Sequence, residues 1–390
     1  MKENELKIFT LAWSFPPMTS GESVICRRSL EYSQWEYDVC SGNTSDIFVT
    51  PKVIKNVHVY PEKGRYFTWS FRAARLFRKL DQQNDYKIML SRVMPAAGHF
   101  AGLLVKCLKP KIKWIVYFSD PVWNSPFISL GSLLINDGSH SPNYLVMKVF
   151  GIPAKIAVFM GDLLVFNNER LAHYVLGSSY KKYKHKVVIA PYGHEGVLSH
   201  KVQIRKNTFI LAHVGQIYGN RTLNVLLEAI KYLKTNNPEL YMKLEIQQIG
   251  FICNTERKKI ICSDVSDRFR LIKEVTYDES IRRMYLADCL LIIDPIFKKS
   301  GCNIYVPVKI FDYMSTGLPI ASIADNDSAT ADIINKIKGI LVPHDAVAVY
   351  KMLEQLLKDS MSAPDLQAYE KFHCKYGAGK LDKAYEKLFS

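Results

Sequence analysis

One stretch of the sequence, residues 294–323 (DPIFKKSGCNIYVPVKIFDYMSTGLPIASI), combines residue types that can bind a phosphorylated ligand. Pro307 suits a first helical turn and Gly317 suits the position just after a helix, so a short helix is predicted between a polar loop and a strand. Lys309 and Asp312 are three residues apart and share one face of this helix. A cation near the helix start with a carboxylate one turn later can bind a phosphate and a ribose diol.

The same pair has a second interpretation, a surface ion pair worth well under about 1 kcal/mol. The loop before the helix is unusually rich in small polar residues. That composition favours the binding interpretation.

Two further loops each follow a predicted strand and precede a predicted helix. In FPPMTSGES (15–23), Gly21 permits close approach of the backbone to an anion at the helix N-terminus, although an ordinary strand-to-helix turn is the alternative. In VGQIYGNRT (214–222), Gly215 is followed by Arg221 at the helix entrance, where a guanidinium can pair with phosphate oxygens. A solvated arginine is equally consistent with that spacing.

The elements that must position these loops alternate between strands and helices, which predicts parallel sheets covered on both faces. In the first half, strands are predicted at 6–15, 86–93, 112–120, 162–168 and 186–193, with helices at 21–34, 96–108 and 169–177. The second half repeats the pattern with strands at 208–217, 243–251, 268–275, 289–294, 319–323 and 339–343, a helix at 222–235 and further helices between the later strands. A short polar segment, 195–207, joins the halves.

The length of 390 residues favours two domains, and a chain that is 48% hydrophobic and 23% charged can bury a sizeable core. We predict a first Rossmann-like domain over 1–197 and a second over 208–375. A C-terminal helix over 376–390 completes the chain, and its packing back onto the first domain is a hypothesis.

The net charge indicates the kind of partner that the chain can bind, and the cysteine spacing bears on whether it holds a metal. A net charge of +15 predicts an anionic partner, which can be nucleic acid, acidic lipid or a phosphorylated substrate. The eight cysteines are scattered without metal-ligand spacing, so reduced thiols and no metal site are expected. No signal peptide or membrane-spanning stretch is evident, and a cytoplasmic location is expected.

Several of these motifs together resemble a known family. VGQIYGNRTLNVLLEAI, followed at a distance by YVPVKIFDYMSTGLPI, resembles the donor-binding half of the family-four retaining glycosyltransferases. FPPMTSG resembles the first glycine-bearing loop of that family, and KWIVYFSDPVWNSPF resembles a segment of its acceptor half. The resemblance covers most of the chain. It implies an α/β protein with two Rossmann-like parallel-sheet domains facing across a cleft (GT-B) and transfer of a sugar from a nucleotide-sugar donor.

The resemblance also implies residue roles. Arg221 stands where the family has a lysine that grips the donor diphosphate, and Asp312 stands where a glutamate binds the ribose. Tyr277 would lie beside the nucleobase and Gly21 near the diphosphate or sugar. The first glutamate of the family motif falls at Ile304, and Gln216 replaces a usual arginine. The residues expected to bind the donor are therefore Gly21, Gly215, Arg221, Tyr277, Ser300, Asn303, Lys309 and Asp312. Asn303, Ser300 or the loop backbone is expected to substitute for the missing glutamate.

For the chemical step, helix N-termini and cationic side chains would stabilise the departing diphosphate, so no metal and no other cofactor is expected. The ionisable candidates in the first half are His99, Asp120 and His194. Asp120 lies in the family-like context FSDP, and Asp120 and His99 are the predicted catalytic residues.

The segment RYFTWSFRAARLFRKL (65–80) mixes aromatic and cationic residues. It is typical of a helix at a membrane interface, and an ordinary amphipathic helix packed on a sheet is the competing interpretation. The expected membrane contacts are Trp69, Phe71, Arg72, Arg75 and Arg78. The membrane interpretation predicts a peripheral protein on the inner face of the cell membrane, acting on a lipid-linked saccharide or glycolipid in bacterial surface polysaccharide synthesis.

Two other classes stay open. A nucleotide-sugar epimerase shares the double Rossmann architecture but needs acid and base carboxylates in its site, which the sequence does not locate. A non-catalytic binder of anions or nucleic acid is suggested by the charge, but no nucleic-acid motif is present and the basic residues are spread along the chain.

Overall fold

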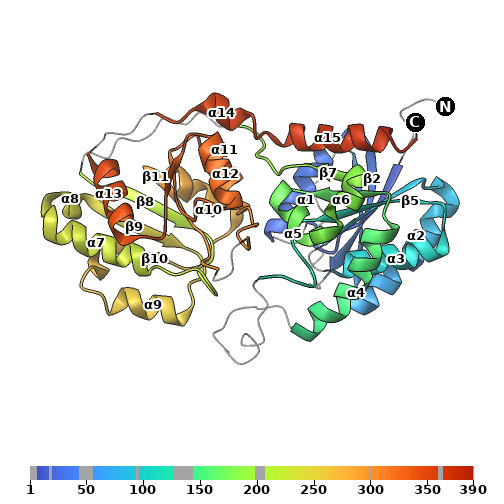
Figure 1. The fold of residues 1–390 in the computed structure, drawn as a ribbon, viewed down its shortest axis with the longest axis horizontal. Coiled ribbons are helices and arrows are strands. Elements are labelled where there is room, and N and C mark those ends of the chain that lie inside the picture. Colours follow the sequence, from blue (N-terminus) through green and yellow to red (C-terminus); the bar gives the residue numbers. More distant parts are fainter. Residues whose placement is uncertain are drawn as a thin grey trace. The chain divides into compact units, whose positions relative to one another are not determined.

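The computed structural model describes residues 7–16, 20–43, 56–93, 96–126, 144–197, 207–297, 301–358 and 363–389. These residues form two compact units, each built around its own parallel sheet (Figure 1). The first unit holds the described residues up to 126, from 144 to 195 and from 372 onward, and the second holds those between 196 and 371. The predicted fold class of two Rossmann-like parallel-sheet domains is confirmed.

The first unit contains a seven-stranded sheet in the order β3-β2-β1-β4-β5-β6-β7, with every neighbouring pair parallel. Its strands are β1 (Lys7–Leu11), β2 (Glu36–Asn43), β3 (Val57–Lys63), β4 (Ile88–Arg92), β5 (Lys113–Phe118), β6 (Leu163–Phe166) and β7 (Val187–Ile189). The chain reverses its direction of travel across the sheet between β1 and β4. In open α/β sheets, ligands bind at this point, outside the carboxyl ends of the strands.

Helices cover both faces of this sheet (Figure 1). Helix α3 packs against α2 and α4, while α1 packs against α15. The helices of this unit are α1 (Gly21–Glu31), α2 (Tyr66–Asn84), α3 (Ala97–Leu108), α4 (Tyr144–Met160), α5 (Glu169–Leu176), α6 (Tyr180–Tyr183) and α15 (Cys374–Glu386), with 3-10 turns at Gly177–Ser179 and Lys184–Lys186.

The second unit contains a six-stranded sheet in the order β10-β9-β8-β11-β12-β13, again with all pairs parallel. The strands are β8 (Phe209–Val214), β9 (Leu244–Ile249), β10 (Phe269–Ile272), β11 (Cys289–Ile293), β12 (Ile320–Ile323) and β13 (Ile340–Val342). The helices are α7 (Asn224–Asn236), α8 (Pro238–Lys243), α9 (Asn254–Ile261), α10 (Tyr277–Tyr285), α11 (Lys309–Thr316), α12 (Ala329–Lys336), α13 (Ala346–Leu357) and α14 (Leu366–Glu370), with a 3-10 turn at Ser266–Arg268. The reversal point in this sheet lies between β8 and β11.

Helix α11 forms at the predicted position and is hydrogen-bonded to the end of strand β8. It ends at Gly317, whose φ of 68° lies in the left-handed region that glycine adopts without strain. The buried hydroxyl of Tyr313 accepts a hydrogen bond from the backbone N–H of Val214, at 2.8 Å. This bond holds the helix against the end of β8 and so positions Lys309 and Asp312.

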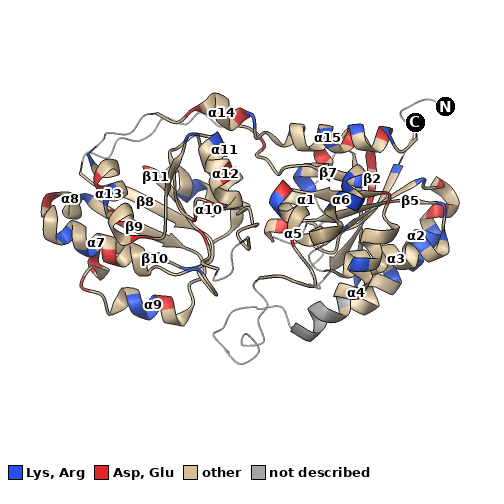
Figure 2. Ribbon diagram, viewed as in Figure 1, with Lys and Arg blue, Asp and Glu red and all other residues tan. Residues whose placement is uncertain are grey.

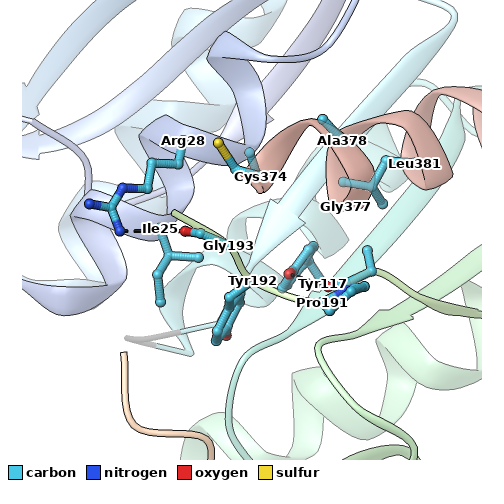
Figure 3. Close-up of a pocket in the computed structure, with 12 residues that line it drawn as sticks. Ile25, Arg28, Tyr117, Pro191, Tyr192, Gly193, Cys374, Gly377, Ala378 and Leu381 are labelled. Atoms are coloured by element: carbon cyan, nitrogen blue, oxygen red, sulfur yellow. Dashed lines mark hydrogen bonds between the residues drawn. The ribbon is translucent and has the colours of Figure 1, made fainter. Parts of the chain in front are cut away.

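The C-terminal helix α15 is fitted closely to the first unit. A Cβ atom at Gly377 would lie 2.3 Å from the carbonyl oxygen of Pro191, and one at Gly193 would lie 2.3 Å from that of Phe372. A small cavity of about 10 Å³ is left beside these contacts. Arg28 is one of its lining residues and donates to the Gly193 carbonyl (Figure 3). That volume admits about one water molecule, so the cavity is a feature of helix packing rather than a ligand site.

Candidate functional site

Basic side chains gather at the carboxyl edge of the second sheet. The Lys309 ammonium, at the start of α11, donates to Nε2 of His213 at 2.6 Å. The other ring nitrogen of His213 lies 2.6 Å from Oε1 of Gln248, whose amide nitrogen donates to the carbonyl of Gly215. Because Gln248 presents its oxygen to the ring, His213 carries its proton on Nδ1 and is neutral. Burial and the nearby Lys309 lower the pKa of His213, which agrees with a neutral ring.

Lys309 and Arg221 reinforce each other as an anion site. Burial, followed by the charge of Arg221, holds the pKa of Lys309 well below its usual range. Two cations that disfavour each other's charge gain most when an anion lies beside both. The guanidinium of Arg221 lies over the ring of Tyr218 with its Cζ atom 5.7 Å from the centroid. The arrangement is suited to a diphosphate, which carries several negative charges on closely spaced oxygens.

Gly215 makes room for the Lys309 side chain. Its φ of 125° is a conformation that residues with a side chain rarely adopt, and a Cβ atom there would lie 3.1 Å from Nζ of Lys309. A Cβ atom at Gly250, at the end of the neighbouring strand β9, would lie 2.9 Å from the carbonyl oxygen of Gly215. The two glycines therefore bring the ends of β8 and β9 together beside the Lys309 side chain.

A carboxylate lies on the next turn of α11. Asp312 is buried, and the hydroxyl of Tyr277, at the start of α10, donates to its Oδ1 atom at 3.0 Å. The Lys309 and Asp312 side chains thus have separate partners. A buried, oriented carboxylate can accept hydrogen bonds from a vicinal diol.

The structure brings together most of the donor residues predicted from the sequence. Gly215, Arg221, Lys309, Asp312 and Tyr277 belong to one edge of the second unit, and Asn303 lies in the loop before α11. Ser300 lies outside the described residues. The side chain of Ile304 is buried, so the position expected to lack a sugar contact contributes to the core.

Three residues of this region were not predicted from the sequence. His213 and Gln248 are buried polar residues within strands, and Asp294 directly follows β11. The only local signal was a polar residue inside an otherwise apolar run, as in FILAHV. Such a residue indicates a buried hydrogen bond but not its partner, which comes from a different strand.

A second group of ionisable side chains lies at the carboxyl edge of the first sheet. Glu22, in the first turn of α1, accepts from Nε of the buried Arg92 at 3.0 Å. The Arg92 guanidinium lies 3.9 Å from the ring centroid of Tyr117. Asp120 follows β5, and burial together with the Glu22 charge raises its pKa to about 7. A carboxyl that titrates near neutral pH can accept or release a proton during a reaction.

Gly21 starts helix α1, next to Glu22. The hydroxyl of Ser20 caps the helix by accepting from the backbone N–H of Ser23 at 3.1 Å. The three residues before Ser20 lie outside the described part of the chain.

The expectation that His99 is catalytic is wrong in this structure. Its side chain is fully buried within α3, with Nδ1 2.9 Å from the Ser91 hydroxyl and the ring 4.8 Å from that of Phe118. Burial lowers its pKa to about 3, so the imidazole is neutral and lies in the core away from solvent. His194, also fully buried, pairs through its backbone with His373 beside α15.

The expectation that Trp69 contacts a membrane is also wrong. Its indole is fully buried, and Nε1 donates to the carbonyl of Ser41 at 2.9 Å. On this side, α2 behaves as an ordinary amphipathic helix, because Trp69 and Phe77 pack on the sheet. Its other side is exposed and cationic (Figure 2), and the remaining predicted contact residues lie there: Phe71, Arg72, Arg75 and Arg78.

Two features of the described residues concern cofactors and membranes. No group of three or more His, Cys, Asp and Glu side chains there is arranged to hold a metal ion. None of the helices in the described ranges has the length and apolar character needed to cross a bilayer.

With two Rossmann-like units of parallel strands, the chain has the GT-B fold. Lipopolysaccharide outer core galactosyltransferase WaaB is similar over 98% of this chain and 100% of its own, with a TM-score of 0.63 and 10% identity. Anabaena HepE, in complex with UDP and glucose, is similar over 98% and 99%, with a TM-score of 0.60 and 11% identity. A structure from Listeria monocytogenes assigned as a UDP-N-acetylglucosamine 2-epimerase is similar over 99% and 97%, with a TM-score of 0.54 and 9% identity.

These likenesses establish the fold that the sequence resemblance implied. At such low identity they carry no residue roles over to this chain. No protein-family model matches the sequence, and no curated protein is significantly similar to it.

Proposed function

We propose that the protein is a glycosyltransferase that takes a sugar from a nucleotide-sugar donor. The observation that carries the proposal is that Lys309 lies within electrostatic reach of Arg221, while the Asp312 carboxylate lies one turn further along the same helix as Lys309. The two cations would hold the diphosphate, and Asp312, oriented by Tyr277, would accept hydrogen bonds from the ribose. The complex of HepE with UDP and glucose is an example of such ligands on the same fold.

In the proposed reaction, the acceptor hydroxyl attacks the anomeric carbon while the bond from that carbon to the diphosphate oxygen breaks. The departing diphosphate carries away the bonding electrons, and Lys309 and Arg221 stabilise its growing charge. These side chains would supply the charge that a divalent cation supplies elsewhere, so we propose a reaction without a metal or other cofactor. We propose retention of configuration, as the family resemblance implies.

Asp120 is the proposed acceptor of the hydroxyl proton. With a pKa of about 7 it is partly ionised at neutral pH and can take up a proton from a hydroxyl that becomes acidic as it bonds to carbon. The Glu22 charge contributes to the raised pKa of this carboxyl, and Glu22 is itself held by its hydrogen bond from Arg92.

The proposed acceptor is a lipid-linked saccharide or glycolipid of a bacterial surface polysaccharide, reached from the inner face of the cell membrane. The exposed side of α2 carries Phe71, 58% exposed, near Arg75 and Arg78. Helix α4, which packs on the same neighbour α3, exposes Ile152 and Phe159 by 64% and 67%. Large exposed apolar side chains next to cations favour contact with an anionic lipid surface.

Calorimetric titration with UDP, GDP and CDP tests the donor site. We expect one nucleoside diphosphate to bind, and Lys309→Ala to weaken its affinity at least about tenfold, which corresponds to about 1.4 kcal/mol. Lys351→Ala, on the exposed side of α13, is the matched control and should bind as the unaltered protein does. The proposal fails if no nucleoside diphosphate binds, or if both variants behave alike.

Nucleotide-sugar epimerisation is the second candidate, because the Listeria structure assigned to that activity shares the fold. The two functions differ in what happens to the donor alone. An epimerase converts the nucleotide sugar without an acceptor, whereas a glycosyltransferase needs an acceptor or water and releases the nucleoside diphosphate. Chromatography of a reaction with the donor alone separates the two.

A further inference from the structure

Near Lys309, the second unit contains a buried carboxyl group with one oxygen that has no hydrogen-bond partner among the described residues. Asp294, which directly follows β11, is 6% exposed, and its Oδ1 atom has no hydrogen-bond partner among the described residues. Both ring nitrogens of His344, just after β13, also lack a partner there. A buried acceptor without a donor costs about 1–3 kcal/mol, so a site that retains one is suited to a ligand that supplies the donor.

Hydrogen bonds connect Asp294 and Asn303 to neighbouring segments of the second unit. Its backbone N–H donates to the carbonyl of Ile323 at the end of β12, at 3.0 Å. The amide nitrogen of Asn303 donates to Oδ2 of Asp325 at 2.6 Å, and the Asn303 carbonyl accepts from the backbone of Ala329 at 2.8 Å. Asp294 and Asn303, which both lie between β11 and α11, are therefore held by hydrogen bonds to β12 and to the segment that follows it.

Burial and several neighbouring groups shift the pKa of Asp294. Burial is the main cause that raises the pKa of this carboxyl, to about 6, and the Asp325 charge adds to it. The Thr330 hydroxyl, Arg221 and Lys309 lower that pKa. Asp294 is therefore within electrostatic reach of both diphosphate-binding cations and of the Asn303–Asp325 pair.

We propose that the Asp294 carboxylate accepts a hydrogen bond from a hydroxyl of the donor's sugar, and that Asn303 and Asp325 hold a neighbouring hydroxyl. This assignment rests on the proposed function. In a nucleotide sugar, the hexose is attached directly to the distal phosphate, so its hydroxyls lie within a few bonds of the oxygens that Lys309 and Arg221 bind. Hydroxyls are the donors that an unsatisfied carboxylate oxygen lacks. A carboxylate repels phosphate, so the sugar rather than the diphosphate is its partner.

The assignment makes Asp294 a residue that selects the sugar and not the nucleotide. A site built to hydrogen-bond a hydroxyl rejects an analogue that lacks it, because the buried group then loses its partner. Asp294 should therefore discriminate between donors that differ at one hydroxyl and be indifferent to the base.

The test compares two ligands on the same variant. We would titrate Asp294→Asn with UDP and with UDP-glucose, or with GDP and GDP-mannose if the guanosine nucleotide is the one that binds. We expect the nucleotide sugar to bind at least about tenfold more weakly than to the unaltered protein. The nucleoside diphosphate should bind equally well or more tightly, because a negative charge near its phosphates has been removed.

A second test variant and a control variant accompany Asp294→Asn. Asn303→Ala, in a partly exposed loop position, should show the same selective loss if Asp294→Asn folds poorly. Asp264→Asn, an exposed aspartate after α9, is the control and should leave both affinities unchanged.

The outcomes separate the two proposals. If no nucleoside diphosphate binds the unaltered protein, the proposed function is overturned and this assignment with it. If the nucleoside diphosphate binds but Asp294→Asn and Asn303→Ala weaken both ligands equally, or neither, the assignment alone is overturned and the carboxyl is satisfied by water.

Discussion

The surroundings of Lys309 leave its charge poorly stabilised until an anion binds beside it. The lysine is held by a neutral imidazole rather than by a carboxylate, and burial and Arg221 disfavour its charge. Asp294 is the nearby group that favours it. A bound diphosphate would add negative charge beside the ammonium and raise its pKa. Binding and protonation of Lys309 should therefore be coupled.

We predict that the nucleoside diphosphate binds with uptake of a proton. Between the lowered pKa of Lys309 in the empty site and the higher one in the complex, affinity should fall as pH rises, because the bound state holds more protons. Calorimetry in two buffers with different ionisation enthalpies measures the uptake. It should vanish in Lys309→Met, and equal heats in both buffers for the unaltered protein would contradict the prediction.

Asp120 provides a second prediction on the scale of one residue. Its folded-state pKa, about 7, is above the value of about 4 expected in the unfolded chain, so the folded state retains the proton over that interval. Unfolding free energy should fall as pH rises from about 4 to 7, and Asp120→Asn should remove this loss. We expect the variant to be about 1–2 kcal/mol more stable than the unaltered protein at pH 8 and equal to it at pH 4.

The same variant separates a catalytic role from a structural one. If Asp120 accepts the acceptor proton, Asp120→Asn should lower kcat about 100-fold or more while the protein becomes more stable at pH 8. Chemical denaturation at the two pH values and initial rates measure the two effects. Unchanged kcat would remove Asp120 from the mechanism.

At the scale of elements, the first prediction concerns the end of β8. Gly215→Ala introduces a Cβ atom at a φ of 125°, 3.1 Å from Nζ of Lys309, so the loop must shift where it contacts the cations. We expect the free energy of unfolding to fall by about 1–3 kcal/mol and nucleoside diphosphate binding to weaken. Gly177→Ala is the control, with a φ of 52° and open space around it. Equal nucleotide affinity in the two variants would show that Gly215 is not part of the site.

The second element-scale prediction concerns α15. Gly377→Ala places a Cβ atom 2.3 Å from the Pro191 carbonyl oxygen, whereas Gly379→Ala, two residues further along the helix, meets nothing within 4 Å. We expect Gly377→Ala to lower the melting temperature. Gly379→Ala should raise it slightly, since alanine is favoured over glycine in a helix by about 0.5–1 kcal/mol. Similar melting temperatures would mean that α15 does not pack closely against the end of β7.

At the scale of the whole molecule, the net charge of +15 predicts attraction to anionic surfaces. We expect the protein to sediment with vesicles rich in anionic lipid, and less so as salt is added. Ile152→Ser with Phe159→Ser on α4, or Arg75→Glu with Arg78→Glu on α2, should reduce the bound fraction several-fold. Arg257→Glu and Lys258→Glu, on α9 of the second unit, are the charge-matched control. Equal losses in the control would indicate a general charge effect rather than a docking surface.

Local patterns were sufficient for most elements but not for β2 and β3. Strand β2 (EYDVCSGN) contains the buried Asp38, which accepts from the Tyr86 hydroxyl and lies 3.5 Å from Nζ of Lys7. Strand β3 contains Pro61 and is half exposed at the sheet edge. A buried charge and a proline both interrupt the apolar run that identifies a strand, and both are tolerated only because of neighbours that are distant in sequence.

The sequence by itself determined the α/β class, the division into two Rossmann-like units and the helix that carries Lys309 and Asp312. These features depend on periodicity and on turn residues, which act over a few positions. The tertiary structure alone decided that Trp69 and His99 face the core, and that Gln248 orients the His213 ring that contacts Lys309. It also decided that the Oδ1 atom of Asp294 is buried without a hydrogen-bond partner among the described residues. Burial and partnership are set by which strands become neighbours in the sheet, and that choice joins residues 35 to 96 positions apart, as in His213–Gln248 and Lys309–His213.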